Sequence, residues 1–141
     1  MSQENVEIVR AFFEAALDGP EGPVKAYLAD DLEFLPFSRM AGPSRGPQGF
    51  MALVADMADQ FERYEVRPER LHGSGELVAA DLRREAKTWR GSALIRDRFA
   101  QVLTLRDGKI ARIRSFPSYA EALEAVGLSE TARQGKDDPD V

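Results

Sequence analysis

The sequence predicts an α+β domain in which a curved mixed β-sheet wraps as a cone around three N-terminal helices, with a short helix at the C-terminus. Apolar residues recur at helical spacing before residue 62, whereas alternation dominates residues 64–117. Between two alternating runs, Asp107-Gly108 predicts a tight hairpin turn. The 141 residues fit one domain over residues 1–128, followed by a polar tail, residues 129–141, that we expect to be disordered.

Breakers and apolar spacing define the N-terminal elements. A first helix is expected over residues 3–17, and Asp18-Gly19-Pro20 ends it. A short second helix opens at Gly22-Pro23, and Asp30-Asp31 ends it. A strand over residues 32–37, a loop over 38–46 and a third helix over 47–61 follow. The buried stripe of that third helix is expected to be Phe50, Leu53, Val54, Met57 and Phe61.

Four strands and a helix complete the fold. The strands are expected over residues 64–71, 76–89, 97–105 and 109–117. Within the first of them, Pro68 marks an edge or a bulge. After Pro117, Ser118 and Glu121 have the spacing of a capping box, in which each side chain bonds the other's backbone N–H. Gly127 ends the last helix.

The central hairpin presents two different faces. Asp97, Phe99, Gln101 and Leu103 share one face of its first strand, and Ile113 and Ser115 share one face of its second. The opposite faces carry arginines among apolar residues. Because both faces carry apolar side chains, we expect neither to face only solvent. One face should pack on the core and the other on a partner.

Composition excludes several classes of function. The chain has no cysteine, which excludes disulfides, thiolate metal sites and a cysteine nucleophile and suits a cytoplasmic protein. No signal peptide and no apolar run of about 20 residues is present, so we expect no membrane partner. The net charge of −5 argues against nucleic acid as a partner. We expect no metal and no cofactor.

Five stretches carry a family resemblance. They are Asn5-Val-Glu-Ile-Val-Arg-Ala-Phe-Phe-Glu-Ala, Tyr27-Leu-Ala-Asp-Asp-Leu-Glu-Phe, Arg45-Gly-x-x-Gly-Phe, Thr104-Leu-Arg-Asp-Gly-Lys-Ile and Ala120-Glu-Ala-Leu-Glu-Ala-Val-Gly-Leu. With them the chain resembles the nuclear transport factor 2-like superfamily over about residues 4–128, particularly its SnoaL-like polyketide cyclase and ketosteroid isomerase-like branch. The resemblance implies the cystatin-like α+β barrel. It does not fix the function, because this fold hosts isomerases, cyclases, hydrolases, carriers and assembly modules.

The resemblance also implies positions for catalytic residues. In ketosteroid isomerase an Asp base, a Tyr and a neutral Asp act together, and these positions fall here on Leu35, Phe12 and Gln101. In limonene epoxide hydrolase the last-strand Asp falls on Ser115, and an Arg-x-Asp pair falls near Leu82 and Arg84. Neither set is complete.

The SnoaL-like cyclases use an Asp/His pair. The only histidine of this chain, His72, lies beside a predicted turn, far from the expected cavity. The residues of all three enzymes are therefore missing from the chain.

Asp97 and Gln101 remain as candidate catalytic residues. Gln101 would donate a hydrogen bond to a ligand carbonyl, or its amide is satisfied by neighbouring backbone or by water. Asp97 is the acid/base candidate if apolar walls raise its pKa. Its alternative is a rim carboxylate paired with Arg84, Arg96 or Arg98.

Apolar walls complete the expected pocket. The resemblance places Phe12, Leu28, Leu35, Val54, Phe99 and Ile113 around it, with Ser115 beside them. Such walls suit a small apolar or aromatic ligand, although a plain core would read the same way. Trp89 lies either at the mouth of the cavity or in a core or interface.

The arginines of the last strands form a further pattern. Arg83, Arg84, Arg96, Arg98, Arg112 and Arg114 are expected on one sheet face. With Asp81 and Glu85 among them, a salt-bridged dimer face or a solvated face fits better than an anion or nucleic-acid site.

Three functions stay open: a cofactor-independent cyclase, isomerase or hydratase on a polyketide- or terpenoid-like substrate, a non-catalytic binder of such a ligand, and a ligand-free homodimerisation module that uses the outer sheet face.

Overall fold

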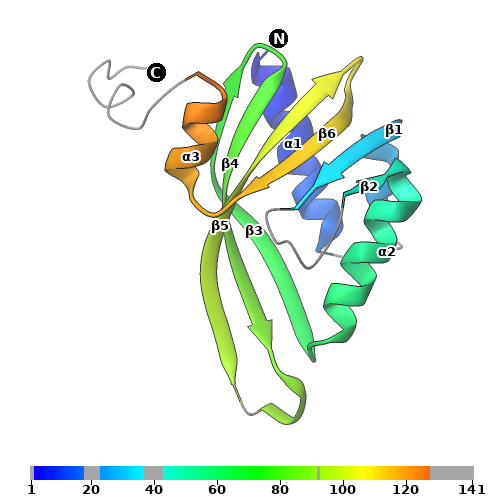
Figure 1. Cartoon of the computed structure of the whole chain (residues 1–141), viewed down its shortest axis with the longest axis vertical. Helices are drawn as coiled ribbons and strands as arrows, with labels where there is room; N and C mark the ends of the chain where they lie inside the picture. The colour runs from blue at the N-terminus through cyan, green and yellow to red at the C-terminus, as the bar shows by residue number, and fades with distance from the viewer. Residues whose placement is uncertain (1, 18–22, 37–42, 92, 128–141) are drawn as a thin grey trace.

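The computed structural model of the chain describes residues 2–17, 23–36, 43–91 and 93–127. It confirms an α+β architecture, with three helices packed on a curved sheet of six strands (Figure 1). In chain order the elements are α1 (Ser2–Ala16), the 3₁₀ turn η1 (Pro23–Tyr27), β1 (Leu28–Leu35), β2 (Ser44–Arg45), α2 (Gly46–Asp59), β3 (Arg63–Ser74), β4 (Leu77–Lys87), the 3₁₀ turn η2 (Trp89–Gly91), β5 (Leu94–Arg106), β6 (Lys109–Phe116) and α3 (Tyr119–Ala125). None of the helices in this part of the chain combines the length and apolar composition that a bilayer crossing requires.

The strands lie in the order β2-β1-β6-β5-β4-β3. The sheet is mixed, because β1 pairs with β6 in parallel while the other neighbours are antiparallel. The predicted hairpin is β5–β6, and Asp107 and Gly108 at its turn have φ of 54° and 76°. Such positive φ values suit Gly and are tolerated by Asp.

The two faces of the sheet have different helices. We call the face that packs against α1 and α2 the inner face, where α1 contacts β3 and β4 and α2 contacts β1 and β2. The main core lies here, and its aromatic centre joins Phe12, Phe34 and Phe50. The opposite, outer face carries only α3 within the described chain, which covers Ala79, Ala100 and neighbouring side chains.

Strand β1 begins earlier than the sequence indicated. The prediction that Asp30-Asp31 ends a helix is wrong, because both residues lie inside β1 and point to solvent. Leu28 and Leu32 of the same strand are buried, and an irregularity of register between Leu28 and Glu33 accommodates the exposed pair. Exposed carboxylates thus interrupt the apolar pattern without interrupting the strand.

Helix α2 buries only part of its predicted stripe. Phe50 is buried and meets Phe34 at 5.1 Å between ring centroids. Met57 was expected to be buried but is exposed, and Phe61 lies beyond the helix, stacked on Tyr64. The main contacts of α2 are with β1 and the edge strand β2, so its last turns extend past the core. Of the expected loop 38–46, Ser44–Arg45 forms β2, Gly46 begins α2, and residues 38–42 lie outside the described chain.

Strands β3 and β5 are longer than predicted, whereas β4 is shorter, and the hairpin of β4 and β5 projects from the body of the molecule (Figure 1). Pro68 lies on the edge strand β3, next to a register shift between Pro68 and Arg70, which confirms the expected edge and bulge. The bulge sends both Glu69 and Arg70 toward the outer face, where they pair with side chains of β4 and β5.

Helix α3 has half of the predicted capping box. The backbone N–H of Glu121 donates to Ser118 Oγ at 3.2 Å, as expected. The second bond differs, because the Ser118 hydroxyl donates to the Glu121 carboxylate at 3.1 Å. Gly127 follows the helix with φ of 88°, the left-handed conformation that ends helices. The predicted tail, residues 129–141, lies outside the described residues.

Candidate ligand site on the inner face of the sheet

Strand register arranges the inner face of β3, β4 and β5 into cross-strand rows. From the projecting ends inward, the rows are Tyr64–Ala86–Ile95, Val66–Arg84–Asp97, Pro68–Leu82–Phe99, Leu71–Ala80–Gln101 and Gly73–Val78–Leu103. Leu82 and Leu103 in the deeper rows are fully buried, whereas the side chain of Asp97 is 41% exposed and Ile95 is 38% exposed. We call the first two rows the open end, because there the apolar interior gives way to solvent.

Most of the predicted pocket walls lie on the inner side. Phe12, Leu28 and Ile113 are buried in the main core, which fits the plain-core alternative at that depth. Val54 and Phe99 are partly buried and pack against this core.

Leu35 does not line the interior. In the β1–β6 register Phe34 pairs with Ile113 on the inner face, and Leu35 pairs with Arg114 on the outer face. Leu28, Leu32 and Phe34 are the core-facing residues of β1, and their even spacing leaves Leu35 on the opposite face, so the count from Ala29-Asp30-Asp31 ended one residue too far. The residue that does point inward is Phe34, which is equally unable to accept a proton.

Gln101 and Ser115 form a buried polar pair on the inner face. Each is 8% exposed, and Gln101 Nε2 donates to Ser115 Oγ at 3.2 Å. A neighbouring side chain thus satisfies part of the amide, a partner different from the backbone or water that the sequence analysis considered. Few polar side chains are buried in the part of the chain that the structure describes. Because a buried polar group without a hydrogen-bond partner costs free energy, the bond between Gln101 and Ser115 stabilises both.

Asp97 is held by Arg84 at the open end. Arg84 Nε donates to Asp97 Oδ1 at 2.8 Å, and Arg84 Nη2 donates to Asp97 Oδ2. This bidentate pair is one of the arrangements that the sequence left open for Asp97. Hydrogen bonding to Asp97, and secondarily to Tyr64, raises the pKa of the Arg84 guanidinium. Arg84 Cζ also lies 5.7 Å from the centre of the Phe99 ring. The result is a carboxylate of fixed orientation beside a permanent cation, and that cation also lies over an aromatic ring.

Tyr64 was not among the candidates from the sequence. Val66 pairs with Arg84, so alternation along β3 places Tyr64 on the same face. The sequence alone did not give the β3–β4 register, which is needed to place Tyr64 on the same face as Arg84. His72 lies opposite Ala79 on the outer face, away from this cluster.

The prediction that six arginines share one face is wrong for Arg84. The other five, Arg83, Arg96, Arg98, Arg112 and Arg114, occupy outer-face positions in the register. Four of these five join the ion pairs Arg83–Glu69, Arg83–Glu85, Arg96–Glu85, Arg98–Glu69, Arg98–Asp81 and Arg112–Glu33. The outer face is therefore salt-bridged, as the interleaved carboxylates indicated.

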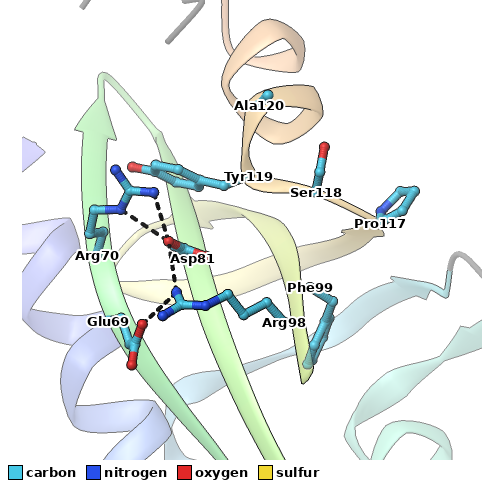
Figure 2. A pocket seen from close by; sticks show the side chains of 9 residues that line it. All are labelled: Glu69, Arg70, Asp81, Arg98, Phe99, Pro117, Ser118, Tyr119 and Ala120. Atoms are coloured by element: carbon cyan, nitrogen blue, oxygen red, sulfur yellow. Dashed lines mark hydrogen bonds and ion pairs between the residues drawn. The ribbon is translucent and has the colours of Figure 1, made fainter. Parts of the chain in front are cut away.

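A groove of about 930 Å³ lies on the outer face beside the start of α3 (Figure 2). On its floor the side chain of Asp81 is only 5% exposed and accepts from Arg70 Nε and Nη2 at 3.0 and 2.9 Å. Arg98 bridges Asp81 and Glu69 at 3.5 and 2.5 Å. Arg70 also lies 4.5 Å above the Tyr119 ring and so connects the sheet to α3. The positive charges of Arg70 and Arg98 thus neutralise the negative charges of Asp81 and Glu69 in this groove.

Replacing Arg70 tests this connection. We expect Arg70→Met to lower the free energy of unfolding by about 1–3 kcal/mol, because the buried Asp81 loses its shortest hydrogen bonds. The double variant Arg70→Met with Asp81→Leu should recover most of the loss. Arg67→Met is the control, since the exposed Arg67–Glu65 pair contributes about 0–1 kcal/mol. Equal effects of Arg70→Met and Arg67→Met in urea unfolding would contradict the assignment.

Comparisons with known proteins support the same fold. The SnoaL-like domain family matches residues 9–113. No curated protein matches the chain. Among solved structures, TerC co-crystallised with polyporic acid is 22% identical, with a TM-score of 0.72 over 88% of this chain and 98% of TerC. A Jannaschia sp. CCS1 protein described as a SnoaL-like polyketide cyclase is 20% identical, with a TM-score of 0.69 over 82% and 85% of the two chains. An NTF2-like protein of Burkholderia xenovorans LB400 is 25% identical, with a TM-score of 0.67 over 86% and 97%.

Proposed function

The chain belongs to the SnoaL-like domain family, within the nuclear transport factor 2-like superfamily, and on that premise we propose that it binds a small, mostly apolar molecule at the open end of the inner face. We propose further that it acts on this molecule as a cofactor-independent cyclase, isomerase or hydratase. The observation that carries the proposal is the Arg84–Asp97 pair, which holds a carboxylate where the apolar interior meets solvent. A polyketide- or terpenoid-like substrate, in the cytoplasm, fits this role.

Asp97 would move the proton in this reaction. A carboxylate fixed by two hydrogen bonds keeps lone pairs free for a ligand, and the neighbouring guanidinium can stabilise negative charge that develops on a ligand oxygen. Gln101 lies four residues further along β5, about 13 Å away along the strand. Asp97 and Gln101 therefore cannot share one reacting atom. In this proposal Gln101 anchors the far end of the ligand, across Phe99.

Proton exchange tests the acid/base role without knowledge of the substrate. The probe is 2-tetralone, a two-ring ketone whose C–H bonds next to the carbonyl exchange with D₂O. We expect the protein to accelerate this exchange, and Asp97→Asn to reduce the acceleration by about 10²-fold, because an amide cannot take the proton. Asp81→Asn, which alters a carboxylate on the outer face, is the control.

The outcomes separate the two ligand-based functions. Acceleration that survives in Asp97→Asn would remove Asp97 from the mechanism. Polyporic acid serves as a second probe, because it was co-crystallised with the similar protein TerC. A rise in Tm with polyporic acid, without acceleration of exchange by the wild type, would favour a non-catalytic binder.

We also propose that two copies associate through the outer sheet face. Cations and carboxylates alternate there, with Arg67, Arg83 and Arg98 in one row and Glu65, Glu85 and Arg96 in the next. A two-fold axis can place carboxylates of one copy against arginines of the other. Sedimentation should find a two-chain species that Arg83→Glu dissociates. A single-chain species at all concentrations would contradict the dimer and leave the ligand site unaffected.

A further inference from the structure

Tyr64 lies beside the Arg84–Asp97 pair at the open end. Val66 pairs with Arg84 across β3 and β4, and Tyr64 is two residues from Val66 on the same face. Such diagonal neighbours are about 7–8 Å apart, a distance that aromatic and long side chains can bridge. Arg84 bridges it, because its guanidinium forms a side-chain hydrogen bond with Tyr64 in addition to its bonds with Asp97. Side chains from β3, β4 and β5 thus form one connected polar group.

The direction of the bond between Arg84 and Tyr64 follows from their chemistry. A guanidinium has N–H donors and no acceptor, so Arg84 donates and the phenolic oxygen of Tyr64 accepts. The hydrogen of the Tyr64 hydroxyl is left over, and within the described part of the chain the structure shows no acceptor for it. A hydrogen bond from a cation to the oxygen also polarises the O–H bond, which strengthens the hydroxyl as a donor. A ligand at the open end can accept this bond.

The ring of Tyr64 is held in place by packing. It is partly buried and stacks on Phe61, with the ring centroids 5.8 Å apart and the planes 21° from parallel. The stacking and the hydrogen bond to Arg84 fix the hydroxyl before a ligand binds, which lowers the entropic cost of binding. The side chains of Asp97 and Arg84 remain 41% and 28% exposed, so the polar group can be reached from solvent.

These three side chains define the ligand chemistry. The charges of Arg84 and Asp97 cancel, so the polar group as a whole is neutral and favours a neutral acceptor over a carboxylate or an ammonium. A ketone oxygen is such an acceptor. A ligand without one would cover the Tyr64 hydroxyl and leave its hydrogen unpaired away from water, which costs free energy and so discriminates against that ligand.

We propose that Tyr64 is the specificity-determining donor of the open end, which selects ligands that place a neutral carbonyl oxygen against its hydroxyl, beside Asp97. The inference rests on the proposed ligand site and adds to it the class of ligand, an apolar ketone. It concerns binding, so it holds for an enzyme and for a non-catalytic binder alike.

Two matched probes test this selection. They are 2-tetralone and tetralin, which has the same two rings with a CH₂ group in place of the carbonyl. Equilibrium dialysis measures the affinity of the protein for each. Tyr64→Phe keeps the ring and its stacking on Phe61 but removes the hydroxyl. We expect it to weaken binding of 2-tetralone about tenfold and to change the affinity for tetralin by less than about twofold.

A control variant and a spectroscopic signal separate a donor to the ligand from a residue that only positions Arg84. Tyr119→Phe removes the same oxygen atom from a tyrosine on the outer face and should leave both affinities unchanged. The infrared carbonyl band of bound 2-tetralone should lie at lower wavenumber in the wild type than in Tyr64→Phe, because a hydrogen bond to the oxygen weakens the C=O bond. Circular dichroism and Tm verify that each variant is folded.

The remaining outcomes distinguish this inference from the proposed function. Equal losses of affinity for 2-tetralone and tetralin in Tyr64→Phe, or the same carbonyl band in both proteins, would overturn the inference, because the hydroxyl would then not contact the ketone. If polyporic acid raises Tm but Tyr64→Phe binds 2-tetralone as tightly as the wild type does, the inference is wrong and the ligand site stands. If the wild type binds neither compound, both are overturned.

Discussion

Leu103→Ala is expected to lower the free energy of unfolding by about 3 kcal/mol, within the range of 2–5 kcal/mol for large-to-small changes in a packed core. Leu103 is fully buried and lies between Val78 and Ile113 on neighbouring strands, both of them also fully buried. The loss combines the transfer of the removed atoms with the cavity that they leave. Urea unfolding measures it.

A neighbour on the other face provides the control for this prediction. Thr104 follows Leu103 but points to the outer face and is only partly buried, so Thr104→Ala should change stability by less than about 1 kcal/mol. A cost below about 1 kcal/mol for Leu103→Ala would mean that the deepest row is not packed. In that case a ligand cavity would reach further into the fold than the open end.

Arg84→Met should weaken binding of polyporic acid about tenfold and lower stability by about 1 kcal/mol. The substitution keeps most of the aliphatic length but removes both hydrogen bonds to Asp97, which are charge-assisted and about 1.5–3 kcal/mol in strength. Asp97 then has no fixed orientation toward the ligand. Calorimetric titration of the purified variant gives the affinity.

Arg83→Met is the matched control for Arg84→Met. Arg83 is the adjacent residue of β4 and pairs with Glu69 and Glu85 on the outer face. The same chemical change one residue away should therefore leave ligand affinity unchanged. If the two variants lose affinity equally, the inner face is not where polyporic acid binds.

The fold was predictable because its signals are local. The Asp107-Gly108 turn, the alternation around it and the Ser118 cap each depend on residues close in sequence, and all three occur in the structure. Long-range effects produced the errors. Met57 was assigned to the core because helical spacing does not tell where a helix extends past its sheet.

The site was predictable only in part. Alternation placed Asp97 and Gln101 on one face correctly, since both belong to one regular strand. Arg84 and Tyr64 belong to β4 and β3, and their meeting with Asp97 depends on strand register, which a single sequence does not reveal. The Leu35 assignment failed because the count from Ala29-Asp30-Asp31 ended one residue past Phe34, which pairs with Ile113 on the inner face.

The crystal structure of the protein grown with polyporic acid tests the ligand site most directly. We expect the ligand on the inner face, with an oxygen atom within hydrogen-bond distance of Arg84 or Asp97 and its rings beside Phe99. A ligand in the outer groove, between Arg98 and Tyr119, would contradict the proposed site.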